Sequence, residues 1–507
     1  MERKWWTLVL SSLATFMLLL DITVVNVALP DIQRDLDASL SSLQWVVDAY
    51  SLMLAACLLT AGSLGDRLGR RRVFSLGLGI FTFASFLCGI AGDPTLLNLA
   101  RGLQGVGGAA MFATSLALIG QEFHGRDRAT AFGVWGATVG GAVAVGPLVG
   151  GLITEHLGWE WIFFVNIPIG IVAVALTELR LANVAAQDPQ RIDLPGLATF
   201  SGGLFLLIFG LIRGNPEGWG STTIVASLAG AVALLLVFLV IEARSSHPML
   251  ELSLFRKPAF NGVSAVAFAL SAGMFAMFLY LTIYMQGVLD FSPLETGLRF
   301  LPLTVLSFVV APISGRLSHR VPIRILVGVG LGMVGLGLLL MHGLDAESDI
   351  SALLPGFLIA GIGIGLTNPS IGQVAIAVVP PAKAGMGSGI NTTFRQVGIA
   401  TGVASLGAIF QSRVDSKLAS LLPDAPAGLS EAVSSGGSRA AATAAPAGQR
   451  TEVVHAAKIA FVSGFNDILM IGAIVAFAGA ALGFVLIRAS DFVPAPREAE
   501  AAEPVPA

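Results

Sequence analysis

Long runs of apolar residues alternate with short polar segments along most of the chain. A membrane-spanning helix needs about 17 to 25 mostly apolar residues, and the runs reach that length. The pattern therefore predicts an all-α membrane protein with about fourteen transmembrane helices. Their first residues are expected near Trp6, Gln44, Val73, Thr95, Ala129, Trp161, Leu194, Thr223, Asn261, Thr296, Ile323, Ser351, Met386 and Asp467.

The basic residues predict how these helices are oriented, because short loops rich in lysine and arginine stay in the cytoplasm. With a cytoplasmic N-terminus, loops with clusters such as Arg70–Arg72 face inward, and acidic loops such as that of Asp93 face outward. Arg34 and Arg213 are exceptions to this pattern. We expect the inner (plasma) membrane of the cell to hold the chain, with both termini in the cytoplasm.

The composition supports a membrane protein and argues against other classes. Only 12% of the 507 residues are charged and 55% are hydrophobic, whereas a soluble domain carries about 25% charged residues. The net charge of −3 and the lack of a long basic tract argue against a nucleic-acid partner. No lysine follows a glycine, so a phosphate-binding loop for a nucleotide is not expected. Cys57 and Cys88 lie in apolar runs, which excludes a disulfide framework.

Three charged residues lie inside predicted spans. At about 1.5 Å per residue, Asp21, Asp48 and Arg101 lie about 12, 8 and 10 Å from the outer boundary, in one layer. A charge at the centre of a membrane helix costs about 2.5 to 3.5 kcal/mol, so such residues have a partner or a task. If Asp21 meets Arg101, a proton that binds the acid releases the arginine. Two alternatives remain open: a permanent ion pair that only holds helices together, and a solvated helix end for Asp48.

Two glycine-rich segments suggest close helix contacts. In "GSLGDRLGRRRV", which begins at Gly62, glycines allow a tight turn, and Asp66 beside four arginines supplies charge to clamp helix ends. The alternative is simple anchoring by positive charge. In "GPLVGG", which begins at Gly146, Pro147 is expected to kink the helix, and spaced glycines let another helix approach closely. Plain packing is the alternative there.

An echo of the first segment indicates an internal repeat. The sequence "GRLSHRVPIR" begins at Gly315, and His319 stands where Asp66 stood. Two related halves are typical of transporters whose binding site lies at the interface of the halves. Between about 413 and 458 the chain is rich in Ala, Gly, Ser and Pro, which predicts a flexible or weakly helical external loop.

Polar residues elsewhere in the spans are candidates for a substrate cavity. The segment "GMFAMFLYLTIYMQ", residues 273–286, mixes Met, Phe and Tyr, which suits an adaptable lining. Such a stripe also fits a lipid-facing surface or a packed core. The candidate cavity residues are Asn26, Asn166, Tyr280, Tyr284, Gln286, Asn391 and Arg395.

The ordered set of motifs resembles the major facilitator superfamily, and within it the fourteen-helix drug:proton antiporter branch. The resemblance covers about residues 5 to 411 and the last helix. It is carried by "LDITVVNVALP" at 20–30, "GSLGDRLGRRRV" at 62–73, "RGLQGVGGAA" at 101–110, "GPLVGG" at 146–151, "WEWIFFVNIPIG" at 159–170, "MQGVLDFSPLETGLRFLP" from Met285 and "GMGSGINTTFRQVG" from Gly385.

The resemblance implies a domain layout. Residues 1–180 are expected to form an N-terminal six-helix bundle, and residues 181–257 a linker with two extra transmembrane helices. Residues 258–490 are expected to form a C-terminal six-helix bundle that includes the external loop at about 413–458. Residues 491–507 are expected to be a disordered cytoplasmic tail. The two bundles would work by alternating access.

The resemblance also implies roles for matching residues. Asp21 would couple to protons and Arg101 would assist proton transfer, with Asp48 as a further candidate. The cytoplasmic gate would consist of Gly62, Asp66, Arg67, Gly69 and Arg70. The antiporter motif would consist of Gly146, Pro147, Gly150 and Gly151. Two positions depart from the family pattern: Ala142 stands where glycine is common, and Glu160 replaces an arginine.

The expected function is proton-driven export of amphipathic or cationic drugs and antibiotics. The protein is expected to be a monomer in the lipid bilayer, with protons as coupling ion, no cofactor, no metal and no enzymatic activity. An alternative on the same scaffold is a dedicated proton-coupled exporter of an endogenous metabolite or lipid. An alternative of another class is a membrane receptor or scaffold that transports nothing.

Overall fold

The computed structural model describes most of the chain. It covers residues 2–38, 40–123, 125–182, 193–245, 248, 250–380, 383–423, 428–430, 432–434, 438, 441 and 450–492. These residues are almost entirely helical, and no strand occurs among them. Residues 493–507 of the expected disordered tail and the middle of the expected external loop lie outside the described residues.

The helices fall into an N-terminal group, an inserted pair and a C-terminal group. The first group is α1 (Arg3–Asp35), α2 (Leu40–Leu68), α3 (Arg70–Gly89), α4 (Pro94–Glu122), α5 (Gly125–Leu157), α6 (Trp161–Phe164) and α7 (Asn166–Arg180). The inserted pair is α8 (Leu194–Glu217) and α9 (Thr222–Arg244). The last group is η1 (Leu252–Arg256), α10 (Pro258–Leu270), η2 (Ser271–Phe275), α11 (Ala276–Ile283), η3 (Tyr284–Val288), α12 (Pro293–Leu317), α13 (Ile323–Leu340), η4 (Ile350–Leu353), α14 (Leu354–Ala377), α15 (Ala384–Leu421), α17 (Arg450–Leu486) and η6 (Ala489–Asp491).

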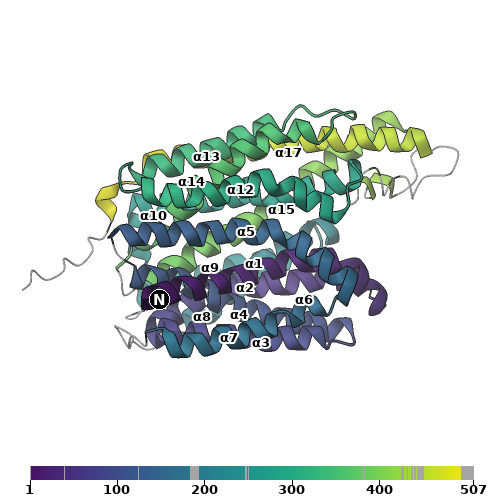
Figure 1. The fold of residues 1–507 in the computed structure, drawn as a ribbon. Helices are drawn as coiled ribbons and strands as arrows, with labels where there is room; N and C mark the ends of the chain where they lie inside the picture. Colours follow the sequence, from purple (N-terminus) through teal and green to yellow (C-terminus); the bar gives the residue numbers. More distant parts are fainter. Residues whose placement is uncertain are drawn as a thin grey trace, which may run out of the picture.

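The number and length of the helices make the chain a multi-pass membrane protein. Thirteen helical segments among the described residues are long and apolar enough to cross a membrane. α5 has 33 residues and no charged residue between Ala129 and Thr154, so it adds a fourteenth. The start of α1 and the last turn, η6, lie at the same end of the bundle, as an even number of crossings requires (Figure 1).

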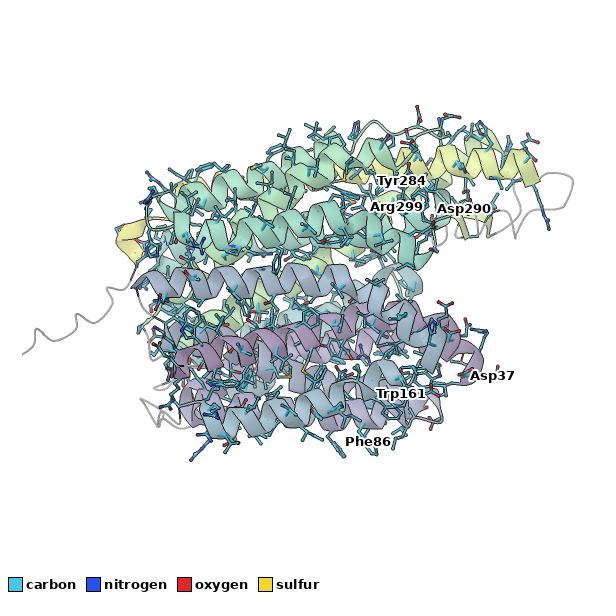
Figure 2. The ribbon with its side chains drawn as sticks, viewed as in Figure 1. Asp37, Phe86, Trp161, Tyr284, Asp290 and Arg299 are labelled. Atoms are coloured by element: carbon cyan, nitrogen blue, oxygen red, sulfur yellow. The ribbon has the colours of Figure 1, made fainter. Side chains whose placement is uncertain are left out.

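The outer surface of the bundle is apolar, as a bilayer requires. Leu99, Leu179 and Val485 are 70%, 77% and 63% exposed, although each lies within a helix. Phe86 on α3 is also exposed and points away from the bundle (Figure 2). Exposed apolar surface on this scale is unfavourable in water but matches the hydrocarbon core of a membrane.

Local sequence signals explain where several helices begin. Pro94 occupies the first turn of α4, and the Asp93 carboxylate accepts hydrogen bonds from the first backbone amides of that helix. α12 begins with a capping box between Ser292 and Glu295. These caps satisfy backbone donors that have no partner within the helix.

The segment expected to be a flexible or weakly helical loop at about 413–458 is helical at both edges. α15 continues to Leu421 and α17 already begins at Arg450. Val414 and Leu418 are buried on one edge, and Val453 and Ala457 on the other. Their spacing of four residues places each pair on one helix face. Charged and small residues lie between these buried positions, so the apolar face of each edge is narrow.

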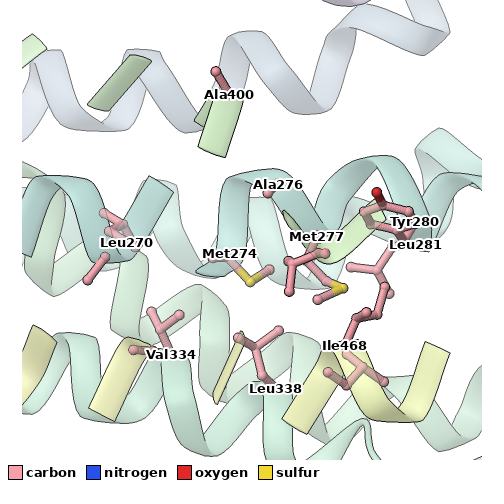
Figure 3. Packing of buried hydrophobic residues seen from close by; sticks show 14 of the residues in the cluster. Leu270, Met274, Ala276, Met277, Tyr280, Leu281, Val334, Leu338, Ala400 and Ile468 are labelled. Carbon is pink, nitrogen blue, oxygen red and sulfur yellow. The ribbon is translucent and has the colours of Figure 1, made fainter. Parts of the chain in front are cut away.

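The Met-rich segment 273–286 packs into the core of the C-terminal group. Met274, Met277 and Met285 are fully buried. Figure 3 shows Met274 and Met277 turned toward Val334 and Leu338 of α13. The structure therefore favours the core interpretation of these methionines over the interpretation as a cavity lining.

The N- and C-terminal groups meet chiefly through α2 and α5 of the N-terminal group. α2 packs against α15, and α5 packs against α12 and α14. The inserted helix α8 packs against both α2 and α15. The end of the bundle at which α2 passes into α3 is called the α2–α3 end. The opposite end, at which α1 passes into α2, is called the α1–α2 end.

Candidate functional site

A buried ion pair lies between α1 and α4. The side chains of Asp21 and Arg101 are each 1% exposed, and an Arg101 Nη1 atom contacts an Asp21 carboxylate oxygen. Arg101 Nε donates to the backbone carbonyl of Val46 on α2, at 2.9 Å. The guanidinium also lies 4.3 Å from the centre of the Tyr50 ring. Three helices thus hold Arg101 in one orientation.

Gln104 completes this network, although the sequence analysis did not single it out. Its side-chain oxygen accepts a hydrogen bond from Arg101 Nη1 at 2.6 Å, and its Nε2 donates to Asp21 Oδ1 at 2.8 Å. Nε2 also lies 2.9 Å from the Ser85 hydroxyl on α3. The signal for Gln104 was its place three residues after Arg101, which puts both side chains on one helix face.

The network brings in one predicted cavity residue. Asn166 of α7 donates to Asp21 Oδ1 at 3.5 Å. Because Asp21 and Arg101 neutralise each other in an apolar interior, the pair is stable only while both are charged. Protonation of Asp21 would remove that balance and leave a buried cation with neutral acceptors only.

Asp48 does not join this network. Its carboxylate lies 3.9 Å from Arg213 on the inserted helix α8. Arg213 also donates to Glu217 at 2.8 Å and lies over the Trp45 ring. Arg213, a basic residue on the side of the membrane expected to be acidic, therefore lies beside two carboxylates. The layer of three charges predicted from the sequence divides into two separate clusters.

The Asp66 carboxylate joins the two groups of helices at the α2–α3 end. Its Oδ1 accepts a hydrogen bond from the backbone amide of Gly385, at 3.0 Å, and its Oδ2 from that of Met386, at 2.9 Å. Both amides belong to the first turn of α15, where the helix dipole is positive. A Cβ atom on Gly62 would overlap the Gly385 carbonyl, so only glycine allows α2 and α15 to approach this closely.

The arginines of the same motif hold neighbouring segments in place. Arg70 donates to Asp66 Oδ1 at 2.8 and 3.0 Å and to the Gln121 side chain of α4 at 3.1 Å. Arg67 donates to the Pro248 carbonyl in the segment after α9. Gly69, between α2 and α3, has a φ of +98°, a conformation that favours glycine. Asp66, Arg67 and Arg70 thus form a clamp of hydrogen bonds at this end of the bundle.

The glycines of α5 allow close packing with two different neighbours. A Cβ on Gly146 would overlap Thr23 of α1, and one on Gly150 would lie 3.2 Å from the Val24 backbone. A Cβ on Gly136 would lie 2.9 Å from Pro369 of α14, across the interface between the groups. Gly151 has open space around it.

α5 is one uninterrupted helix through Pro147. The side chains of Pro147 and of the candidate cavity residue Asn26 lie outside the described residues.

The predicted cavity residues of the C-terminal group do not converge on one point. The Tyr280 hydroxyl donates to the Val403 carbonyl at 3.1 Å, and the Tyr284 hydroxyl to the Ser348 carbonyl at 3.2 Å. Tyr284 is fully buried and stacks on the rings of Phe461 and Phe465, near the α1–α2 end (Figure 2). In the loop beside it, a hydrogen bond from the Ser348 hydroxyl lowers the pKa of Asp345.

The other three candidates lie elsewhere in this group. Gln286 is half-buried in the turn η3. Asn391 and Arg395 lie one turn apart on α15; Asn391 is buried, and Arg395 is half-buried beside the Phe275 ring. A cavity of about 380 Å³ opens between α10, α15 and α17 in the same region. Among the described residues, no group of His, Cys, Asp or Glu side chains has the arrangement of a metal site.

Two packed groups of membrane helices, a buried Asp–Arg network in one of them and a charged clamp between them define an α-helical membrane transporter. The chain belongs to the Major Facilitator Superfamily, whose family model matches residues 11–403. Membership in this family identifies the protein as a transporter rather than an enzyme.

The curated relatives and the solved structures agree with this assignment. The chain is 33% identical to the "Tetracenomycin C resistance and export protein" of Streptomyces glaucescens, over 100% of this chain and 95% of the relative. It is 38% identical to the "Puromycin resistance protein pur8" of Streptomyces alboniger, over 80% of this chain and 82% of the relative. The fold is similar to that of the proton:xylose symporter XylE, with a TM-score of 0.65, 12% identity and coverage of 96% of both chains.

Proposed function

We propose that the protein is a proton-driven antiporter that exports amphipathic drugs and antibiotics from the cell by alternating access. The observation that carries the proposal is the buried network of Asp21, Arg101 and Gln104. Acidic residues inside membrane spans mark proton pathways in transporters. The curated relatives named for resistance and export support the choice of drugs and antibiotics as cargo.

The network supplies a physical means of coupling. When a proton neutralises Asp21, Arg101 is left as an unbalanced cation in an apolar layer, which is unfavourable. A rearrangement of α1 against α4 then lowers the free energy of the protonated state. Release of the proton restores the ion pair and favours the arrangement described above.

The clamp at the α2–α3 end supplies the gate. Opening that end requires α15 to leave the Asp66 carboxylate, so two hydrogen bonds and a favourable charge–dipole contact must break. With the predicted orientation this end faces the cytoplasm, and the arrangement corresponds to an outward-facing state. We further propose a monomer in the plasma membrane, with cytoplasmic termini and protons as the coupling ion in place of a cofactor.

Everted membrane vesicles with an imposed proton gradient test this function. Uptake of radiolabelled puromycin and proton release on its addition are measured for the wild type, Asp21→Asn and Asp290→Asn. Asp290 is exposed at the end of the bundle opposite the clamp (Figure 2), so its variant controls for the loss of a carboxylate.

We expect the wild type and Asp290→Asn to accumulate puromycin and release protons, and Asp21→Asn to do neither. Gradient-driven uptake that survives in Asp21→Asn would contradict the role of Asp21. Puromycin uptake by the wild type that is insensitive to the gradient would contradict proton coupling itself.

A further inference from the structure

Arg395 is a positive charge inside a membrane span that the described part of the protein does not balance. Asp21 is paired with Arg101, and Asp48 lies beside Arg213. Among the described residues, no carboxylate lies within 4.0 Å of Arg395. The nearby Phe275 ring, 5.5 Å away, contributes only a weak cation–π contact. Such a residue inside a membrane normally serves a pathway or a ligand.

Other hydrogen-bonding groups without partners lie beside Arg395. Asn391 precedes it by four residues on α15 and therefore lies on the same helix face. The Asn391 Nδ2 atom is buried and has no hydrogen-bond partner among the described residues. The Ser271 hydroxyl of η2 is also fully buried without a described partner. A Cβ on Gly398 would lie 3.1 Å from Ser271 Cβ, so α15 passes directly over η2.

The backbone of η2 is a π-helical turn between α10 and α11. Such turns occur frequently at functional sites, because they change which residues face a neighbouring helix. Met274 of this turn faces α13 (Figure 3), whereas Ser271 and Phe275 contact α15. The turn thus presents a hydroxyl and an aromatic ring to the helix that carries Arg395.

An apolar cavity lies further along the same α10–α15 seam. Phe268, three residues before Ser271, and Phe394, next to Arg395, line the cavity of about 380 Å³. Ser264 also lines it, and its buried hydroxyl has no described partner. The volume lies within the range of small-molecule sites, about 300 to 1,000 Å³.

We propose that Arg395, Asn391 and Ser271 form a subsite for the acidic group of an amphipathic substrate, and that the adjoining cavity receives its apolar body. The substrate class is therefore aromatic or aliphatic carboxylates, sulfonates and phenolates, rather than the cations expected from the buried aspartates. Arginine and amide nitrogens are donors that match such oxygen acceptors. The inference rests on the proposed export function but is tested by binding alone.

The test compares two dyes with the same aromatic body. 1-Anilinonaphthalene-8-sulfonate carries an acidic group, and N-phenyl-1-naphthylamine lacks it. The Kd of each dye is measured by fluorescence on purified protein for the wild type, Arg395→Gln, Arg395→Lys, Asn391→Leu and Arg320→Gln. Arg320 is exposed outside the helices, so its variant controls for the loss of one positive charge.

We expect Arg395→Gln to weaken sulfonate binding by about ten-fold or more, since a hydrogen bond to a charged group contributes about 1.5 to 3 kcal/mol. Binding of the neutral dye should stay within about two-fold, Arg395→Lys should recover most of the sulfonate affinity, and Arg320→Gln should bind both dyes normally. Asn391→Leu should weaken sulfonate binding selectively and provides a second variant if Arg395→Gln does not fold.

Equal losses for both dyes would show that Arg395 is only structural and would overturn the proposal. A wild type that binds the sulfonate no more tightly than the neutral dye would also overturn it. The outcome is separable from the export function, because puromycin transport and its gradient dependence are measured in vesicles without these dyes.

Discussion

At the scale of single residues, two aspartates at similar predicted depth differ in their surroundings. Asp21 is enclosed by Arg101, Gln104 and Asn166, all within the N-terminal group. Asp48 faces Arg213 on an inserted helix at 3.9 Å. The structure thus places Asp21 in a network within one group of helices and Asp48 at a contact with an inserted helix.

Asp48→Asn should retain most gradient-driven puromycin uptake in vesicles, because the Asp21 network does not depend on it. Arg213 keeps its hydrogen bond to Glu217, so we expect a stability loss of about 1 kcal/mol or less. Loss of substrate-induced proton release in Asp48→Asn, with normal amounts of folded protein, would instead make Asp48 a proton carrier.

Gln104→Leu should lower the free energy of unfolding by about 1 to 3 kcal/mol, because it leaves buried partners on Asp21, Arg101 and Ser85 unsatisfied. Thermal unfolding of the detergent-purified protein measures the effect. Gln33→Leu, at an exposed position near the end of α1, is the matched control and should change little. An equal Tm for both variants would show that Gln104 does not support the network.

At the scale of helices, the glycines of α5 differ in what surrounds them. Gly146 lies directly against Thr23 of α1, whereas Gly151, five residues later, has no neighbour within 4 Å. The motif that contains both therefore includes one position required by packing and one that packing leaves free.

Gly146→Ala should destabilise the protein by about 1 to 3 kcal/mol, because the new methyl group overlaps the Thr23 side chain at its branch point. Gly151→Ala should be neutral or slightly stabilising, because alanine favours the helix. Chemical or thermal unfolding of the two purified variants gives the comparison. Equal stability of the two would mean that α1 moves away without a penalty.

At the scale of the whole molecule, the contacts between the two groups of helices gather toward the α2–α3 end. Gly62 and Asp66 of α2 meet the first turn of α15 there. Gly133 of α5 lies against Pro312 of α12 in the same half of the bundle. Further along α5, Gly146 and Gly150 face α1 instead. The molecule is thus held closed at one end.

Asp66→Asn should weaken this closure, because the charge that faces the amides of α15 is lost. The test uses a chain without its native cysteines, in which Met386→Cys is labelled by a membrane-impermeant maleimide. We expect its labelling to rise about five-fold or more, because losing about 1 kcal/mol of charge–dipole attraction raises the population of the open state by about that factor. Labelling of Leu68→Cys, which is already 45% exposed, should not change. Unchanged labelling of both positions would show that Asp66 does not hold the end closed.

The sequence by itself determined the class of the protein and much of its layout. Apolar runs gave the spans, because a bilayer requires about 20 apolar residues per crossing whatever the neighbours are. The turn at Gly69 and the clamp at Asp66 were also readable, because glycine and charge signals act over a few residues.

Only the tertiary structure decided which buried groups meet. A membrane helix is apolar on most faces, so its sequence does not reveal how it is rotated against its neighbours. For this reason the pairing of Asp48 with Arg213, the place of Gln104 and the burial of Tyr284 appeared only once the helices were packed. The helical edges of α15 and α17 were concealed for a related reason, because a narrow apolar face gives a weak pattern whose burial depends on the helices around it.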